Sequence, residues 1–501
     1  WDKPDGNVSS YYIQILGEPN SNTTVTTTYS TIEGLIPGNY YTFLVSARVG
    51  ENNVQGNNVV IAEYTKPGVV KNLKTENITT TSIFLSWEKP DGNSSSYFIQ
   101  ILEDPTFDMN VTTTSYTIEI LTPGNYYTIL VYAQVGENNV QGAYDIVSNY
   151  TIPDVVKNLT AENITTTSIS LRWDKPDGNV SSYYIQILGE PNSNTTVTTT
   201  YRTIEGLIPG NYYTFLVSAR VGENNVQGNN VVIAEYTKPG VVKNLKTDNI
   251  TTTSISLSWE KPDGNASSYF IQILEDPTFY MNVTTTSYTI EILTPGNYYT
   301  ILVSAFVGGN TVQGGIYYTF EYTEPGVVKN MTAQSINTTS ISLSWEKPEG
   351  NASTYLIQIL EDPAFNRTVT TTYYAIGGLT PGYYYTFLVS VLVGENSVQG
   401  KAVPVSEYTK PGIVKNLRTE NINTTSISLS WEKPDGNASS YFIQIMGDPN
   451  FNRTVTTTAD TIEGLTPGNY YTFLVSAHVG EITVQGEDVS VSTYTSELIF
   501  R

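Results

Sequence analysis

The chain has 501 residues, no cysteine, one histidine and a formal net charge of −22. This acidity disfavours nucleic acid and anionic lipid as partners, because both attract clustered lysine and arginine. Thiolate chemistry is excluded without cysteine, and a single histidine nearly excludes histidine triads and two-histidine zinc sites. No run of 18 apolar residues occurs, so we expect no membrane span or membrane insertion within these residues.

The first 66 residues show a series of short strand-like runs. Tyr11, Ile13 and Ile15 fall on one face of the first run, and further runs follow at 23–28 and 31–35. A loop at 50–56 and a last strand ending near residue 65 complete the series. No stretch has the pattern of a helix. Regular short strands between turn residues are typical of an all-β sandwich.

An eleven-residue segment, Leu-Ile-Pro-Gly-Asn-Tyr-Tyr-Thr-Phe-Leu-Val at 35–45, organises the whole chain. Pro-Gly predicts a turn, and the strand after it places Tyr41, Phe43, Val45 and Ala47 on the face expected to form the core. The segment recurs every 86 residues, starting at Leu35, Leu121, Leu207, Leu293, Leu379 and Leu465, and the tryptophans keep the same step at Trp1, Trp87, Trp173, Trp259, Trp345 and Trp431.

A fixed period of this length is typical of an array of small domains. The predicted domains are 1–66, which is truncated at its N-terminus, 67–152, 153–238, 239–324, 325–410 and 411–501. Each full unit shows seven strand-like runs, and the run at 82–87 places Ile83, Leu85 and Trp87 on one face. Trp1 matches the middle of a unit, so we expect the chain to be a piece of a longer protein.

A leucine, a Pro-Gly turn and an inward tyrosine resemble the tyrosine corner of immunoglobulin-like sandwiches. Together with the tryptophan in Leu-Ser-Trp-Glu-Lys-Pro at 85–90, they make each unit similar to a fibronectin type III domain. The resemblance implies a tandem array of seven-stranded sandwiches. Proline recurs at the junctions, at 67, 153, 239, 325 and 411, and such short junctions are semi-rigid, so we expect an extended rod.

Two longer phrases resemble a particular group within that family. They are Thr-Thr-Thr-Ser-Ile-Ser-Leu-Ser-Trp-Glu-Lys-Pro-Asp-Gly-Asn at 251–265 and Pro-Gly-Asn-Tyr-Tyr-Thr-Phe-Leu-Val-Ser-Ala at 37–47. They look like the ectodomain repeats of receptor-type tyrosine phosphatases of the eta kind. The resemblance implies extracellular, heavily glycosylated repeats, followed in that family by a membrane span and a cytoplasmic phosphatase. It carries over the module and its location but not the activity.

A second, longer period lies within the first. Residues 1–86 and 173–258 differ only at Ser30/Arg202, Glu76/Asp248 and Phe84/Ser256, so a two-domain block of 172 residues has been duplicated. Copies this similar have not acquired separate roles. The duplication therefore favours a spacer or a repeated binding surface over one unique site.

Sequons for N-linked glycosylation, Asn-x-Ser/Thr, recur in each unit. One set lies six residues after each tryptophan, a second near the following loop, and a third before the tryptophan strand. Because these sets repeat in predicted loops, we expect N-linked glycans and hence a secretory route. The candidate asparagines are Asn7, Asn22, Asn77, Asn93, Asn110, Asn149, Asn158, Asn163, Asn179, Asn194, Asn249, Asn265, Asn282, Asn330, Asn337, Asn351, Asn366, Asn423, Asn437 and Asn452.

The face of the central strands that points away from the core is unusually apolar. A patch repeated on every unit is harder to dismiss than scattered surface apolar residues, and it predicts a protein-contact face. The candidate residues are Tyr12, Leu16, Tyr40, Leu44, Phe98, Leu102, Tyr126, Leu130, Phe270, Leu274, Tyr298 and Leu302.

Catalysis has little support in the sequence. His478 occupies a position that varies between units, and Glu-Asp-Pro recurs at 103–105, 275–277 and 361–363, so both are expected to be structural. Asp-Gly-Asn lacks the ligand spacing of a calcium loop and is interpreted as a turn. We therefore expect no enzyme activity, no cofactor and no metal in these residues.

The sequence favours an extracellular, glycosylated repeat array that acts as a receptor ectodomain or an adhesion spacer through protein–protein contacts. A secreted structural protein that self-associates into glycosylated filaments is the alternative, and an enzyme is a distant third.

Overall fold

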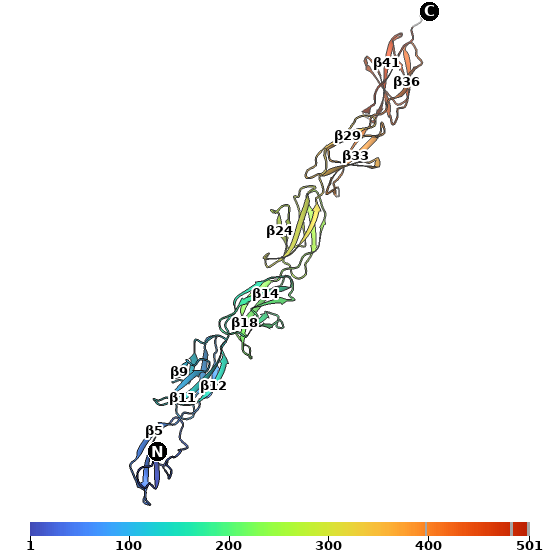
Figure 1. Cartoon of the computed structure of the whole chain (residues 1–501). Helices are drawn as coiled ribbons and strands as arrows, with labels where there is room; N and C mark the ends of the chain where they lie inside the picture. The colour runs from blue at the N-terminus through green and yellow to red at the C-terminus, as the bar shows by residue number, and fades with distance from the viewer. Residues whose placement is uncertain (396–397, 481–483, 498–501) are drawn as a thin grey trace. The chain divides into compact units, whose positions relative to one another are not determined.

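The computed structural model describes residues 1–395, 398–480 and 484–497, and in this part of the chain it consists of strands and turns without a helix (Figure 1). The all-β prediction is therefore confirmed. We name the six predicted ranges repeats 1 to 6 in chain order. All strand pairs with a described register are antiparallel, as expected for sandwiches built from hairpins and crossovers between sheets.

Repeat 2 shows the complete arrangement, with seven strands in two sheets. The three-stranded sheet has the order β10-β7-β6 and the four-stranded sheet the order β12-β11-β8-β9. Its strands are β6 (Lys71–Glu76), β7 (Ile83–Glu88), β8 (Ser96–Ile101), β9 (Asp108–Val111), β10 (Ser115–Ile118), β11 (Tyr126–Val135) and β12 (Val140–Tyr150). Repeat 4 repeats this pattern with β21 (Lys243–Asp248), β22 (Ile255–Glu260), β23 (Ser268–Ile273), β24 (Tyr280–Val283), β25 (Ser287–Ile290), β26 (Tyr298–Val307) and β27 (Val312–Tyr322).

In repeats 3, 5 and 6 the last strand is divided in two, which gives a five-stranded second sheet. Repeat 3 contains β13 (Lys157–Glu162), β14 (Ser168–Asp174), β15 (Ser182–Ile187), β16 (Thr195–Val197), β17 (Tyr201–Glu205), β18 (Tyr212–Val221), β19 (Val226–Gln227) and β20 (Val231–Tyr236). Repeat 5 contains β28 (Lys329–Ser335), β29 (Ile341–Glu346), β30 (Thr354–Ile359), β31 (Asp362–Val369), β32 (Tyr373–Ile376), β33 (Tyr384–Val393), β34 (Val398–Gln399) and β35 (Val403–Tyr408). Repeat 6 contains β36 (Lys415–Glu420), β37 (Ser426–Glu432), β38 (Ser440–Ile445), β39 (Asp448–Val455), β40 (Ala459–Glu463), β41 (Tyr470–Val479), β42 (Val484–Gln485) and β43 (Val489–Tyr494).

Repeat 1 forms one sheet only. Its strands are β1 (Ser10–Ile15), β2 (Thr23–Val25), β3 (Tyr40–Val49), β4 (Val54–Gln55) and β5 (Val59–Tyr64). The predicted strand at 31–35 is wrong: these residues form no strand. The equivalent strand of repeat 2, β10, pairs only with the tryptophan strand β7, and these 501 residues contain only the end of the corresponding segment, from Trp1.

The core of each complete repeat lies between its two sheets, where the alternating pattern predicted it. In repeat 4 the exposed fraction of Tyr299 is 6%, and Ile301, Val303 and Ala305 are fully buried. In repeat 2, Ile83 and Leu85 are fully buried. The strands therefore keep the period of two that side-chain alternation requires.

The tyrosine corner is present in all six repeats. The inward tyrosine of each organising segment accepts a hydrogen bond at its hydroxyl from the backbone N–H five residues earlier, at 2.8 to 3.0 Å. The donor and acceptor pairs are Ile36 to Tyr41, Thr122 to Tyr127, Ile208 to Tyr213, Thr294 to Tyr299, Thr380 to Tyr385 and Thr466 to Tyr471.

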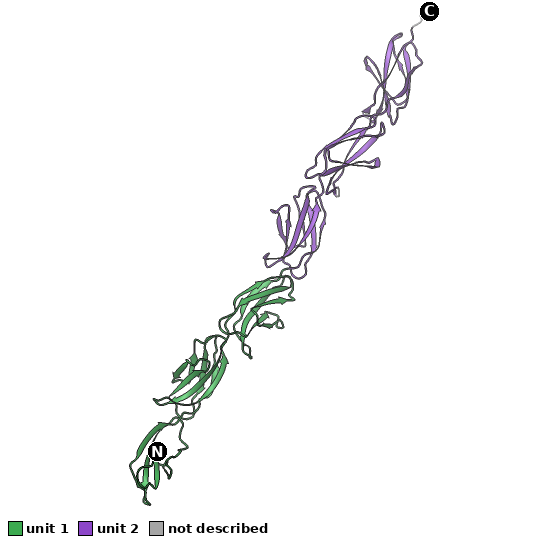
Figure 2. Ribbon diagram, viewed as in Figure 1, with its two compact units in different colours: residues 1–238 green, residues 239–501 purple. Residues whose placement is uncertain are grey.

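The chain divides into two compact units, residues 1–238 and 239–501, drawn in different colours in Figure 2. The first unit holds repeats 1 to 3 and the second holds repeats 4 to 6.

Candidate functional site

The sequon asparagines are surface residues. All of them are exposed except Asn149, which is half-buried. Asn149 belongs to β12, lies opposite the inward Tyr127, and donates a hydrogen bond from its side-chain amide to Thr75 Oγ1 at 3.2 Å. Its position toward the other sheet makes it the least accessible member of the predicted set.

The second set of sequons was predicted to lie in loops, and this prediction is wrong for part of the set. Asn110, Asn282, Asn366 and Asn452 lie within β9, β24, β31 and β39, the strands at one edge of each second sheet. The strands of these hairpins continue into residues that the sequence pattern assigned to the loop. An exposed edge strand is a template for unwanted strand pairing. A glycan at this position would lie beside that edge.

The third set occupies two positions of one turn. Asn77, Asn163 and Asn249 adopt a left-handed backbone, with φ of 47° in each. Asn337, two residues further along the repeat, instead accepts a hydrogen bond at its side-chain oxygen from the Thr339 N–H at 2.8 Å. In repeat 2 the Thr79 hydroxyl accepts from the Thr81 N–H in the same way. The strict register expected for this set therefore breaks in repeats 5 and 6, where the sequons are at Asn337 and Asn423.

The predicted contact face is only partly accessible. The exposed fractions of Leu16, Leu102 and Tyr40 are 61%, 58% and 55%, whereas Leu130 and Leu302 are only 5% exposed. The strand register places these two leucines opposite Ile146 and Tyr318, which are larger than the Val60 opposite the half-buried Leu44. Leu130 and Leu302 are therefore withdrawn from the face. Of the remaining predicted residues, Tyr126, Leu274 and Tyr298 are exposed and Tyr12, Phe98 and Phe270 are half-buried.

The tyrosines that begin each long central strand pair with a tyrosine of the last strand. Tyr40 and Tyr64 have ring centroids 4.8 Å apart, and Tyr126 and Tyr150 lie 4.9 Å apart. The ring of Tyr64 also meets repeat 2, because a Cβ on Gly136 would lie 2.5 Å from it. Gly222 meets Tyr150 in the same way, and Gly480 meets Tyr408. The next repeat thus covers the tyrosine of the last strand, whereas its partners in the predicted face, Tyr40 and Tyr126, stay exposed.

The Pro-Gly turn of one repeat packs directly on the Asp-Gly-Asn turn of the next. A Cβ on Gly38 would lie 1.9 Å from the Asn93 carbonyl oxygen, and one on Gly92 would lie 2.1 Å from that of Pro37. Both glycines have positive φ, of 68° and 79°. Real Cβ atoms do not come so close, so each turn requires the glycine of the other. The same reciprocal pair recurs at Gly124 with Gly178, Gly296 with Gly350, and Gly382 with Gly436.

The asparagine after the second glycine of each pair joins the two turns by hydrogen bonds; in repeat 5 the turn is Glu-Gly-Asn at 349–351. The Asn93 N–H donates to the Pro37 carbonyl at 3.0 Å, and the Asn93 side-chain amide donates to Asn39 Oδ1 at 2.9 Å. Asn351 makes the same two bonds to Pro295 and Asn297, at 2.9 and 2.6 Å. The sequence identified Asp-Gly-Asn as a turn but missed this interface. Its only signal was that both glycines keep the period of 86 residues.

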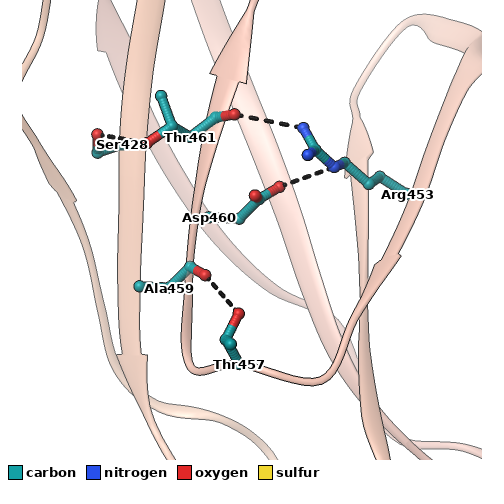
Figure 3. A network of polar contacts seen from close by, with 6 residues as sticks. All are labelled: Ser428, Arg453, Thr457, Ala459, Asp460 and Thr461. Atoms are coloured by element: carbon teal, nitrogen blue, oxygen red, sulfur yellow. Dashed lines mark hydrogen bonds and ion pairs between the residues drawn. The ribbon is translucent and has the colours of Figure 1, made fainter.

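At the edge of the core, repeat 6 has an ion pair at a position where other repeats have an aromatic residue (Figure 3). Arg453 Nε lies 3.1 Å from Asp460 Oδ2, and the Arg453 guanidinium donates a hydrogen bond to the Thr461 carbonyl at 3.3 Å. The Asp460 side chain is only 14% exposed. Repeats 2 and 4 carry Tyr116 and Tyr288 at this position, packed against the core. The ion pair thus substitutes for buried aromatic surface and is not a catalytic constellation.

The remaining titratable candidates have structural contacts. His478 packs on the Phe442 ring at 5.3 Å between centroids, and burial lowers the pKa of its imidazole while the charge of Asp488 raises it to a smaller extent. In the Glu-Asp-Pro loop, Glu103 accepts a hydrogen bond from the Thr128 N–H at 2.7 Å and Asp104 accepts one from the Thr106 hydroxyl at 2.6 Å. These carboxylates hold their own loop in place.

None of the residues that the structure describes belongs to a helix long and apolar enough to cross a bilayer. They also contain no group of three histidine, cysteine or acidic side chains placed to hold a metal ion.

Comparison with known proteins identifies the family. The model of the fibronectin type III domain matches residues 67–143, 154–234, 239–314, 325–406 and 410–491, and the chain therefore belongs to the fibronectin type III family. It is 32% identical, over 97% of its length, to receptor-type tyrosine-protein phosphatase eta of Gallus gallus, of which the match covers 36%. It is 35% identical over 85% of its length to receptor-type tyrosine-protein phosphatase H of Homo sapiens, covering 40% of that protein.

A third relative is of a different kind. Tenascin-N of Mus musculus is 22% identical over 96% of this chain, with 32% of its own length covered. The chain thus spans well under half of each of these relatives. The matched repeats are a non-catalytic fold, so these residues themselves are not an enzyme.

Proposed function

We propose that this chain is an extracellular, N-glycosylated repeat array that holds other parts of a protein apart and presents protein-contact surfaces, as a receptor ectodomain or adhesion spacer. N-linked glycans and protein partners are its expected ligands, and the charge of −22 disfavours nucleic acid. The similarity to two receptor-type phosphatases and to a tenascin over most of the chain supports this function. The six predicted domain ranges remain part of the proposal.

The observation that carries the proposal is the exposure of the sequon asparagines in every repeat. Glycans are bulky and hydrophilic and are attached only in the secretory pathway, so a glycosylated array must keep its acceptor sites on the surface. Sequons arising by chance in a chain rich in asparagine and threonine would fall on buried strand positions as well. Here only Asn149 is withdrawn from solvent.

Glycopeptide mass spectrometry of the secreted chain tests the location directly. We expect hexosamine on most of Asn93, Asn179, Asn265, Asn351 and Asn437, the first-set asparagines of the complete repeats. Unmodified asparagine at all five positions would remove the extracellular argument.

A second candidate function is lateral assembly into filaments, favoured by the exposed leucines of the second sheets. Leu16 and Leu102 are 61% and 58% exposed, and Leu274 is 48% exposed. One such face buries too little area, because stable interfaces bury at least about 1,200 Å² in total. Several repeats acting together reach that area and gain from their linkage.

Sedimentation velocity distinguishes the two functions. Apolar assembly survives high salt, since it does not depend on attraction between charges. A glycosylated chain that forms large species at high salt, and loses them in Leu102→Ser/Leu274→Ser, supports the filament. A chain that stays monomeric over the whole concentration range supports the spacer.

A further inference from the structure

The second-set asparagines lie on the same side of the second sheet as the aromatic residues of the predicted contact face. In repeat 2, Met109 and Val111 of β9 pack against the core, so Asn110 between them points outward. The register places Asn110 directly opposite Phe98 of β8. In repeat 4, Asn282 lies opposite Phe270 in the same way. Directly opposed residues have Cβ atoms about 4.5 to 5.5 Å apart, so their side chains meet.

The opposite phenylalanine belongs to an aromatic platform. In repeat 4, Phe270 stacks with Tyr280 at 6.3 Å between centroids and meets the edge of Phe306 at 6.0 Å. In repeat 2, Phe98 lies 6.1 Å from Tyr132. Phe98 and Phe270 are half-buried, so part of each ring is still open to solvent. Such platforms expose apolar surface that water solvates poorly.

We propose that the N-linked glycans on Asn110 and Asn282 fold back onto this platform, with the first N-acetylglucosamine lying over Phe98 and Phe270. The inference rests on the proposed glycosylation. The sugar is bonded to the side-chain amide nitrogen of the asparagine. The phenylalanine ring that it covers belongs to the residue directly opposite on the neighbouring strand. A pyranose ring presents C–H groups on its faces, and these are attracted to the electron-rich face of an aromatic ring.

The glycan thereby becomes the occupant of the apolar face in repeats 2 and 4. It covers surface that a second copy of the chain would need for lateral contact, and it lies beside the edge strands β9 and β24. The arrangement favours the spacer over the filament, because the carbohydrate removes both the apolar contact and the free edge.

Repeat 5 provides a natural control. Its second-set asparagine, Asn366, lies opposite Gln358, which donates a hydrogen bond to Asn366 Oδ1 at 2.8 Å. The next outward residue of β30 is Leu356, opposite Thr368. A glycan on Asn366 therefore has no aromatic ring directly across the strand pair.

The test uses the full chain, with occupancy first checked by glycopeptide mass spectrometry. Thr284→Ala removes the Asn282 sequon but keeps the asparagine, and Thr368→Ala does the same for Asn366. Hydrogen exchange of the β23–β24 hairpin should accelerate roughly two- to tenfold in Thr284→Ala, the range expected for loss of an aromatic contact. Exchange of the β30–β31 hairpin should not change in Thr368→Ala.

A second variant tests whether the effect of the glycan depends on the ring of Phe270. In a Phe270→Leu background, which copies the leucine of repeat 5, Thr284→Ala should cause no further acceleration. Equal acceleration with and without Phe270, or equal acceleration in the Thr368→Ala control, overturns the inference. So does loss of protection when enzymatic trimming of the wild-type chain leaves one N-acetylglucosamine, a measurement that needs no variant.

Three further results also overturn the proposal, and they are distinguishable. Unmodified Asn110 and Asn282 beside occupied asparagines elsewhere refute the folded-back glycan but leave the proposed function standing, whereas unmodified asparagine throughout refutes both. A glycosylated chain that dimerises and protects the β23–β24 hairpin shows that a second copy covers the face.

Discussion

The reciprocal glycines between repeats allow a matched test of the inter-repeat interface. Repeat 6 contains Gly436 and Gly464, both with φ of 80°. A Cβ on Gly436 would lie 2.0 Å from the Pro381 carbonyl oxygen of repeat 5, whereas a Cβ on Gly464 has no heavy atom within 4 Å. Gly436→Ala and Gly464→Ala therefore impose the same backbone strain, and only the first disturbs a neighbouring repeat.

The expected difference in stability between the two variants follows from their contacts. Each substitution costs about 1–2 kcal/mol for placing a Cβ in the left-handed region. Gly436→Ala must also push the turns apart, which breaks the hydrogen bond from the Asn437 N–H to the Pro381 carbonyl at 3.0 Å. That bond contributes about 0.5–1.5 kcal/mol, and the steric overlap adds a comparable amount. We expect Gly436→Ala to lose about 1–3 kcal/mol more than Gly464→Ala.

Hydrogen exchange of the full chain is the appropriate assay, because a chain of several domains does not unfold in one two-state step. The Asn437 amide should exchange roughly fivefold faster or more in Gly436→Ala, since 1.4 kcal/mol corresponds to a factor of ten. It should stay close to wild type in Gly464→Ala. Equal acceleration of this amide in the two variants would show that the turns are not coupled and that our reasoning is wrong.

Three further predictions concern single repeats. Tyr299→Ala should destabilise repeat 4 by about 3 kcal/mol or more, as other aromatic truncations in cores do, and Tyr298→Ala should destabilise it by far less. Equal losses of protection from hydrogen exchange in the two variants would show that the assigned strand register is wrong. The double change Arg453→Met/Asp460→Tyr gives repeat 6 the residues of repeats 2 and 4. Repeat 6 should then be as stable as wild type or more stable, because buried apolar contacts often stabilise as much as a partly buried ion pair or more. A clear loss of protection from hydrogen exchange in repeat 6 would contradict this prediction. Burial lowers the pKa of His478 below its ordinary value of 6.5, so the unfolded chain binds more protons and repeat 6 should lose stability as the pH falls below about 6.5. His478→Phe should remove that dependence, and its persistence in the variant would assign it to another group.

Local pattern was enough to predict the inner faces of the strands. Tyr298 and Tyr299 are neighbours in sequence, yet the first is 42% exposed and the second 6%. Alternation along a strand separates them, and one Pro-Gly turn sets its phase. The same rule failed for the accessibility of Leu130, which points outward as predicted but is only 5% exposed. Its cover comes from the size of its cross-strand partner Ile146, which depends on the register of β12.

The sequence did not predict the interface between repeats. Gly38 and Gly92 are 54 residues apart, and each forms a turn that its own neighbours explain completely. Their contact depends on how two sandwiches meet, which no local pattern encodes. The periodic spacing shows that something keeps both glycines in place, but it does not name the partner of either.

Val231 and Ile233 of repeat 3 separate the two kinds of information. The alternating pattern of the last strand-like run by itself determined that these residues form a strand and that both side chains lie on one face. In the structure both side chains pack against the core of repeat 3. Only the tertiary structure decided what buries that face, because the covering sheet is built from β13, β14 and β17, which lie earlier in the chain.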